Sequence, residues 1–244
     1  MLQRLKRRAG RWIDYMCLSA TARRIRAERL TYLPLRKLVR IESALAEIRR
    51  NRVQGDVIEF GVALGGSAIL LAQAAGEGRR FFGLDVFAMI PPPTSEKDDA
   101  RSKERYETIA SGQASGFGDD PYYGYRDDLY EHVSAQLARF GTPVDGQQVN
   151  LVKGLFEETL PTLDVERIAF AHIDCDWYDP VRYCLRETAR RLAPGGVIVI
   201  DDYNDYAGCR TAVDEFLARN GDFDMEPGLN PILRRAASAR PPAH

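Results

Sequence analysis

The stretch DVIEFGVALGGSAILLAQAA, residues 56–75, decides the fold of this chain. Its first five residues form a short apolar, β-branched run, which is typical of a buried strand. Glycines then punctuate residues 61–67, and a helical run follows at 68–75. A strand that turns through glycine into a helix is the expected first unit of an α/β sheet.

The same alternation continues along the rest of the chain. Four more apolar segments predict strands, at residues 80–85, 148–152, 168–173 and 197–200. The last two are uninterrupted apolar runs, typical of parallel strands buried on both faces. Residues 35–49 and 180–192 predict helices, and the proline and glycines at 194–196 would end the second one. We therefore expect a doubly wound α/β domain with helices on both faces of a mostly parallel sheet.

The composition is that of an ordinary folded protein. The 244 residues are 45% apolar and 28% charged, which excludes collagen-like and wholly disordered chains. Lys plus Arg (34) nearly balances Asp plus Glu (35), so the net charge of −1 gives no overall attraction to nucleic acid. Because no apolar run reaches the roughly 18 residues that a membrane span needs, we expect no transmembrane segment.

The cysteines and histidines indicate the compartment and the metal chemistry. The four cysteines form no CxxC pair and are too sparse for a small disulfide-stapled domain, so we predict a reducing, cytoplasmic location. Only three histidines are present, which makes a histidine-rich zinc site improbable on composition. Hard oxygen ligands are the expected metal donors.

The glycine segment is the first candidate binding motif. Its expected cofactor residues are Glu59, Gly61, Gly65, Gly66 and Ser67. Glycines let the backbone approach a ligand, and the helix that follows presents free N–H groups. The spacing is not GxGxxG, and Glu59 would repel a phosphate but suits a cation such as the sulfonium of S-adenosylmethionine. The alternative is a glycine turn that serves packing alone.

Three further residues extend the predicted adenosine site. Asp85 ends the second predicted strand, where a carboxylate can accept both hydroxyls of a ribose. Gly154 and Phe156 follow the third strand and would border the adenine ring. The alternatives are a turn or capping role for Asp85 and a core role for Phe156.

Acidic pairs follow two of the predicted strands. Asp174 and Asp176 come after residues 168–173, and Asp201 and Asp202 come after residues 197–200. The carboxyl ends of adjacent parallel strands meet at one edge of a sheet, where ligands bind. Because crowded carboxylates are costly without a cation, we expect these four to hold Mg²⁺ or a similar divalent metal. The alternative is scattered, solvated turn aspartates.

Four blocks of residues together resemble the macrocin O-methyltransferase (TylF/MycF-type) family, over roughly residues 30 to 220. They are residues 59–67, GLF at 154–156 with TLP at 159–161, IDCD at 173–176 with Tyr178, and PGG at 194–196 running into DDY at 201–203. The blocks occur in the family's order and at similar intervals. The chain departs from the family pattern at Cys175 and Trp177 and within residues 91–122. These differences bear on the identity of the acceptor and not on that of the cofactor.

The resemblance implies a Rossmann-like class I S-adenosylmethionine-dependent methyltransferase with a seven-stranded sheet. It implies Mg²⁺-assisted methyl transfer to a hydroxyl of a sugar or related natural product, so the expected partner is a small-molecule or glycan acceptor. The glycine segment also resembles that of catechol O-methyltransferases, and by that comparison Asp174, Asp201 and Asp202 fall on metal-ligand positions. Asp176 is then either a further ligand or the general base.

Two residues are candidates for the proton acceptor. An alcohol needs help to become a nucleophile, from a metal that lowers its pKa and from a base. Asp176 is the expected base and His172 the reserve. For His172, which lies one step inside a predicted buried strand, a hydrogen-bonded core role is the alternative.

The chain divides into a central domain and three special segments. Residues 1–30 carry nine basic against two acidic side chains and form an expected arm, which would pack on a sister subunit of a homo-oligomer or contact a membrane surface peripherally. Residues 31–235 form the methyltransferase domain, and 236–244 a flexible tail. The polar insertion at residues 91–122 is either a lid, with the tyrosines at 122, 123, 125 and 130 lining the acceptor site, or disordered.

Two other classes of function stay open at this level. One is a non-catalytic module that binds an adenosine ligand, and the other is a nucleotide-dependent oxidoreductase. The missing GxGxxG spacing weighs against the second. A nucleic-acid methyltransferase is disfavoured because only residues 1–30 are basic.

Overall fold

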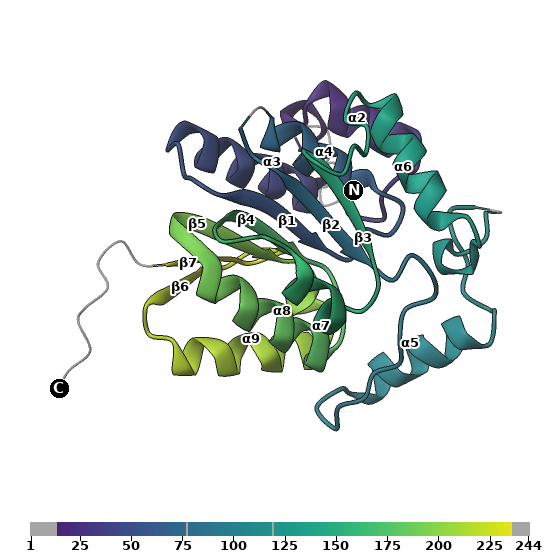
Figure 1. The fold of residues 1–244 in the computed structure, drawn as a ribbon. Helices are drawn as coiled ribbons and strands as arrows, with labels where there is room; N and C mark the ends of the chain where they lie inside the picture. The colour runs from purple at the N-terminus through teal and green to yellow at the C-terminus, as the bar shows by residue number, and fades with distance from the viewer. Residues whose placement is uncertain (1–13, 77, 119, 236–244) are drawn as a thin grey trace, which may run out of the picture.

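A seven-stranded sheet forms the centre of the molecule (Figure 1). The computed structural model describes residues 14–76, 78–118 and 120–235. The strands lie in the order β3-β2-β1-β4-β5-β7-β6. They are β1 Asp56–Phe60, β2 Phe81–Asp85, β3 Val149–Lys153, β4 Ile168–Ile173, β5 Leu192–Ile200, β6 Phe223–Glu226 and β7 Ile232–Arg235. The first five pair in parallel, whereas β7 pairs antiparallel with β5 and β6.

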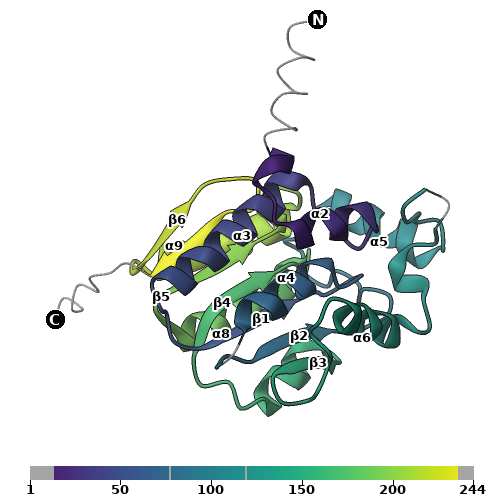
Figure 2. The same ribbon diagram turned by 90° about the horizontal axis from the view of Figure 1, so that it is seen from above.

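Helices cover both faces of the sheet (Figure 2). One face packs against α2 Ala20–Ala27, α3 Leu35–Arg50, α4 Gly66–Ala75 and α6 Leu129–Arg139. The other packs against α7 Phe156–Thr159, α8 Tyr178–Arg191 and α9 Ala207–Arg219. Helix α5, Ala100–Ala110, lies apart, beyond the carboxyl ends of the strands (Figure 1). The expected doubly wound α/β fold is confirmed.

The apolar runs of the sequence explain why the sheet is covered on both sides. In β1, Val57 belongs to the core under α3 and α4, and the next residue, Ile58, belongs to the core under α8 and α9. Side chains alternate between the faces of a strand, so a strand buried on both faces is apolar at most of its positions. All residues of β1, β2 and β4 are buried.

Some element boundaries differ from those expected. The third strand runs over Val149–Lys153 rather than residues 148–152. Helix α8 begins at Tyr178 rather than at residue 180. Residues 194–196, expected to separate this helix from the next strand, are part of β5. Pro194 and Gly195 are exposed there, in the irregular part of the pairing with β4 between Leu192 and Val197. No described helix has the length and apolar content needed to span a membrane.

The expected boundary at residue 30 is wrong for the part of the arm that the structure describes. Leu18, Ala22 and Ile25 are buried in the same core as α3 and α4. An arm that was merely solvated would leave these side chains in water, so α2 belongs to the domain. The most basic part of the arm, residues 1–13, and the expected tail, residues 236–244, lie outside the described residues.

The insertion at residues 91–122 is folded in the part that the structure describes, which leaves out residue 119, and its first part is bonded to the start of α8. The indole Nε1 of Trp177 donates to the backbone oxygen of Pro91 at 2.9 Å, and the backbone N–H of Tyr178 donates to Oδ1 of Asp98 at 2.9 Å. Helix α5 follows, capped by the side chain of Asp99. The disordered alternative for this segment is therefore excluded, and whether it moves as a lid stays a prediction.

Candidate active site

The four acidic residues predicted from the strand ends converge at the carboxyl edge of the sheet. The backbone N–H of Asp174 donates to the oxygen of Phe60, and that of Asp201 donates to the oxygen of Ile173, each at 2.9 Å. These bonds continue the sheet for one residue beyond β4 and β5 and bring the two aspartates side by side. Ligand atoms of His172, Asp174 and Asp201 all lie within 4.8 Å of one another.

Burial and mutual repulsion oppose the ionisation of this cluster. Burial, followed by the charges of Asp201 and Asp202, raises the pKa of Asp174 well above its usual range. Burial, followed by the charges of Asp176 and Asp201, does the same to the pKa of Asp202. Burial, followed by the charge of Asp201, raises the pKa of Asp176 to about 7. Such a cluster is stabilised by any cation placed among its oxygens.

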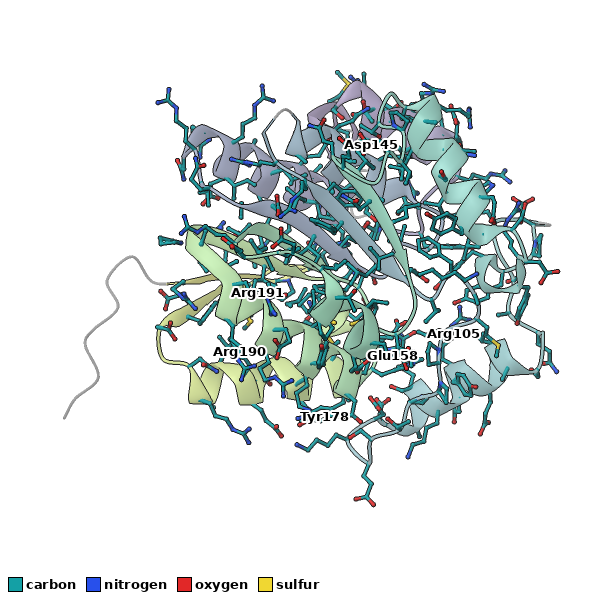
Figure 3. The ribbon with its side chains drawn as sticks, in the orientation of Figure 1. Arg105, Asp145, Glu158, Tyr178, Arg190 and Arg191 are labelled. Atoms are coloured by element: carbon teal, nitrogen blue, oxygen red, sulfur yellow. The ribbon has the colours of Figure 1, made fainter. Side chains whose placement is uncertain are left out.

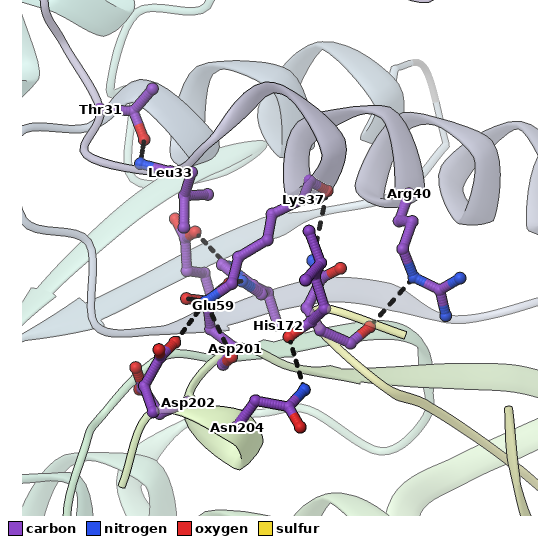
Figure 4. A network of polar contacts seen from close by, with 12 residues as sticks. Thr31, Leu33, Lys37, Arg40, Glu59, His172, Asp201, Asp202 and Asn204 are labelled. Carbon is purple, nitrogen blue, oxygen red and sulfur yellow. Dashed lines mark hydrogen bonds and ion pairs between the residues drawn. The ribbon is translucent and has the colours of Figure 1, made fainter. Parts of the chain in front are cut away.

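Lys37 supplies part of that positive charge. From α3 its Nζ donates to Oδ2 of Asp201 at 2.7 Å and to Oδ2 of Asp205 at 2.9 Å (Figure 4). Burial by itself would raise the pKa of Asp201. The proximity of His172 and Lys37 outweighs burial, so the pKa of Asp201 is lowered. Sequence reasoning missed Lys37, which sits among the apolar positions of an amphipathic helix.

The remaining oxygens fit a divalent metal. Oδ1 of Asp201 is buried and has no hydrogen-bond partner among the described residues, whereas its Oδ2 is held by Lys37. A buried carboxylate oxygen without a partner is costly, and a hard cation removes that cost. Asp174, Asp201 and Asp202 offer the carboxylate oxygens that Mg²⁺, Mn²⁺ or Ca²⁺ prefer.

His172 lies beneath the cluster rather than in it. Its Nδ1 is 2.9 Å from Oε1 of Glu59, and its Nε2 is 3.7 Å from Oδ1 of Asp201. Although burial opposes it, the proximity of Asp201 and Glu59 raises the pKa of His172 to about 9. The imidazole is fully buried and lines neither of the cavities described below. The reserve role as general base is therefore corrected, because a base must reach the proton that it removes.

The expected cofactor residues of the glycine segment separate into two groups. Gly61 lines both cavities, whereas Glu59, Gly65, Gly66 and Ser67 line neither. A Cβ on Gly66 would lie 2.4 Å from the backbone oxygen of Leu30, and one on Gly65 would lie 3.0 Å from Val133. Gly66 thus allows close packing against the loop after α2, and Gly65 against α6. Direct cofactor contact by Glu59, Gly65, Gly66 and Ser67 stays a prediction.

Gly61 is required for the edge of the sheet to close. Its φ is +90°, and a Cβ there would lie 1.8 Å from the backbone oxygen of Asp174. Only glycine allows β1 and β4 to approach this closely as they end. The residue thus couples the glycine segment to the acidic cluster.

Asp85 holds the glycine segment from the adjacent strand. Its Oδ2 accepts from the backbone N–H groups of Val62, at 2.7 Å, and Ala63, at 3.1 Å, and its Oδ1 accepts from Phe87 at 2.7 Å. Burial raises the pKa of Asp85, and these bonds oppose the rise. The carboxylate lines both cavities. Asp85 thus has the turn role that was the alternative to ribose binding. The two roles are compatible, because its oxygens keep lone pairs for a ligand.

Two cavities meet at the acidic cluster. The more apolar one, of about 410 Å³, is lined by Gly154 and Phe156 together with Val86, Ile90 and Pro91. The more polar one, of about 480 Å³, is lined by aromatic and cationic side chains: Tyr32, Lys37, Arg101, Arg105, Tyr122, Tyr123, Trp177 and Tyr206. Gly61, Asp85, Asp174 and Asp176 line both.

The tyrosines expected at the acceptor site are divided by the structure. Tyr122 and Tyr123 line the polar cavity. The hydroxyl of Tyr125 instead donates to the backbone oxygen of Ile109, and Tyr130 packs edge-on against Phe87. Tyr32 and Tyr206 were missed, since nothing in their sequence surroundings distinguishes them from other surface tyrosines.

Comparisons with known proteins bear on the family and the fold of this chain. The sequence profile of the family described as Macrocin-O-methyltransferase (TylF) matches residues 27–225. An 8-demethyl-8-(2,3-dimethoxy-alpha-L-rhamnosyl)-tetracenomycin-C 4'-O-methyltransferase of Streptomyces olivaceus is 30% identical over 198 residues, 80% of this chain and 70% of the relative. The Mycinamicin III 3''-O-methyltransferase of Micromonospora griseorubida is 29% identical over 201 residues, 80% of this chain and 72% of its own. The solved structure of the O-methyltransferase NovP superposes with a TM-score of 0.70 at 22% identity, covering 85% of this chain and 82% of NovP.

Proposed function

Because the chain belongs to the macrocin O-methyltransferase family, an enzyme family, we propose that it transfers a methyl group from S-adenosylmethionine to a hydroxyl of a sugar or related natural-product acceptor, assisted by Mg²⁺. One observation carries this proposal. Asp174 and Asp176 line both cavities, so a donor in one and an acceptor in the other would meet at the same carboxylates. The alternatives of a non-catalytic module and of an oxidoreductase are wrong, because the family consists of methyltransferases.

The apolar cavity is the proposed donor site. Gly154 and Phe156 form one wall, and Phe156 is held by an edge contact with Phe60, at a centroid distance of 5.5 Å. An apolar slot with an aromatic wall suits an adenine ring. Asp85 stands where the two cavities join and would accept the ribose hydroxyls.

Asp174, Asp201 and Asp202 would hold the magnesium ion. When bound, the ion lowers the pKa of an acceptor hydroxyl and fixes the position of its oxygen. Lys37 leaves this role possible because it occupies only Oδ2 of Asp201, whereas Oδ1 accepts no hydrogen bond from the described residues. His172 and Glu59 support Asp201 from beneath.

Asp176 is the proposed general base. It borders both cavities, and its backbone φ of +56° turns the chain sharply between β4 and α8. Without metal the pKa of Asp176 is about 7, and a cation nearby would lower this pKa and keep the carboxylate ionised, as a base requires. Asp176 takes the hydroxyl proton as the acceptor oxygen bonds to the methyl carbon and the bond from that carbon to sulfur breaks, which leaves S-adenosylhomocysteine.

Methyl transfer from labelled S-adenosylmethionine to a panel of rhamnosides and glycosylated natural products tests the proposal. We expect turnover with Mg²⁺, loss of turnover with a chelator, and a fall in kcat of about 10²-fold or more for Asp176→Asn with donor affinity retained. Asp224→Asn, an exposed carboxylate on β6, is the matched control. Equal turnover with and without chelator, together with an active Asp176→Asn enzyme, would refute this mechanism.

Three further expectations also remain proposals. We propose that the enzyme works in the cytoplasm, where its four cysteines stay reduced. We also propose that it forms a homo-oligomer and that the basic residues 1–13 contact a partner or an anionic membrane surface. Light scattering and sedimentation with anionic vesicles measure these two properties directly.

A further inference from the structure

Two arginines one helical turn apart face the polar cavity from α5. Arg101 and Arg105 stand four residues apart, so they share one face of the helix, and both line the cavity. Figure 3 shows Arg105 on the side of α5 that is turned toward the body of the protein. Lys103, between them in sequence, is exposed and lines no cavity described above.

The guanidinium of Arg105 is held in place without using its hydrogen-bond donors. Its central carbon lies 5.4 Å from the centroid of the Tyr122 ring. Within the described part of the chain it forms no hydrogen bond and no ion pair within 4.0 Å. A guanidinium has five N–H donors, and here they border a cavity rather than a carboxylate.

Arg101 is similar but uses one donor. Its central carbon lies 5.6 Å from the centroid of the Tyr206 ring, and its Nη1 donates to the backbone oxygen of Asp205 at 2.8 Å. No described carboxylate forms an ion pair with it. The two guanidinium groups therefore leave most of their donors available on one wall of the cavity.

Neutralising the acidic cluster accounts for only part of this arrangement, because the charge of Arg105 lowers the pKa of Asp176 but neither arginine bonds a described carboxylate. The ammonium of Lys37 already contacts the carboxylates of Asp201 and Asp205, and the proposed metal would take the other oxygens. An arginine that served only as a counter-charge would be expected to bond a carboxylate, because bidentate pairs with carboxylates are strong. These two instead rest on aromatic rings on the acceptor side.

We propose that the acceptor carries an anionic group, a carboxylate or a phosphate, which Arg101 and Arg105 bind while the reacting hydroxyl lies at Asp176. This inference rests on the proposed function and names the acceptor class of the same site. A planar fork of N–H donors matches the oxygens of either anion. Tyr32, Tyr122 and Tyr206 would pack on the sugar ring between the anion and the metal site.

Calorimetric titration of the protein loaded with S-adenosylhomocysteine and Mg²⁺ tests this inference. The probes are methyl β-D-glucuronide and glucose 1-phosphate, with methyl β-D-glucoside as the neutral comparison. We expect at least one anionic sugar to bind about tenfold or more tightly than the neutral one, since a hydrogen-bonded charge pair is worth about 1.5–3 kcal/mol. The sugar that shows this preference identifies the source of the anion.

Variants of α5 then assign the preference to its residues. Arg105→Gln and Arg101→Gln should each remove most of the preference, by weakening the anionic sugar much more than the neutral one. Lys103→Gln, on the same helix and outside the cavity, should leave the preference intact. Arg105→Lys, which keeps the charge but not the fork, should retain only part of it.

Several outcomes would overturn the inference. Equal binding of charged and neutral sugars would do so, as would failure of both anionic sugars to bind. A preference that survives both glutamine variants would mean that the metal, rather than α5, receives the anion. Unchanged affinity for S-adenosylhomocysteine in every variant separates these results from a failure of the methyltransferase proposal, which would abolish donor binding.

Discussion

The Nζ atom of Lys37 lies 2.7 Å from Oδ2 of Asp201, although 164 positions separate the two residues in the chain. Both side chains are almost fully buried. The contact joins α3, the helix before β1, to the loop after β5. It therefore ties α3 to the acidic cluster.

Replacement of Lys37 by methionine tests how much this contact contributes. The change leaves Asp201 and Asp205 without their ammonium partner and should lower the free energy of unfolding by about 3 kcal/mol, because a buried carboxylate then loses its counter-charge. Urea denaturation monitored by circular dichroism measures the loss. Lys153→Met, at an exposed position on β3, should cost less than about 0.5 kcal/mol. Equal stabilities of the two variants would contradict this account.

The acidic cluster should make stability depend on divalent metal. Mg²⁺ that binds only the folded protein stabilises it by mass action, by about 2.7 kcal/mol at one hundred times its Kd. For a domain of this size the Tm should rise by about 5 °C or more. Thermal unfolding with Mg²⁺ and with a chelator gives the difference.

Asp174→Asn is the sharper version of that experiment. The amide replaces a carboxyl group whose ionisation is opposed by burial and by the charges of Asp201 and Asp202, so the metal-free variant should be more stable than the metal-free parent at neutral pH. It should also lose most of the response to Mg²⁺. A variant that is less stable without metal, yet responds normally to Mg²⁺, would remove Asp174 from the site.

Gly61→Ala should damage the fold more than a positive φ alone explains. Its Cβ would lie 1.8 Å from the Asp174 oxygen, so β1 and β4 must separate where they end. Gly141 has a similar φ of +85°, but a Cβ there meets no atom within 4 Å. Gly141→Ala should therefore cost about 1–2 kcal/mol, from strain only, and Gly61→Ala clearly more. Chemical denaturation of both variants, with donor titration of each that folds, makes the comparison.

The metal-free protein should lose stability as pH rises from about 6.5 to about 9. His172 has a folded pKa raised from 6.5 to about 9, so its contribution is complete below 6.5 and is lost through 9. Asp176 has a folded pKa raised from 3.8 to about 7, so it acts with the same sign, but its contribution is lost between pH 3.8 and about 7, mostly below the range in which His172 titrates. Urea midpoints measured across this range in chelator give the trend.

Replacement of His172 isolates its contribution to the pH dependence of stability. His172→Gln should flatten the loss between pH 7 and 9, because the glutamine does not titrate. Added Mg²⁺ should reduce the part due to Asp176, since a nearby cation favours the carboxylate. A midpoint that rises with pH in chelator would reverse the sign and refute the argument.

The sequence by itself determined the sheet, the family and the place of the carboxylates. Uninterrupted apolar runs predict parallel strands, and the ends of parallel strands share one edge, so Asp174, Asp176, Asp201 and Asp202 were expected together and lie together. The five parallel strands follow from local pattern in this way. The antiparallel strands β6 and β7 are short and carry charges, which hides them from such a pattern.

Only the tertiary structure decided what surrounds those carboxylates. Glu59 pairs with His172 in register across β1 and β4, and the alternation of side chains turns both beneath the site rather than into it. Lys37, Arg101 and Arg105 come from helices that reach the edge of the sheet by packing, at separations that leave no periodic trace in the sequence. The presence of a buried strand is encoded locally, in its run of apolar residues, whereas the approach of a helix to a distant loop depends on how the whole core packs.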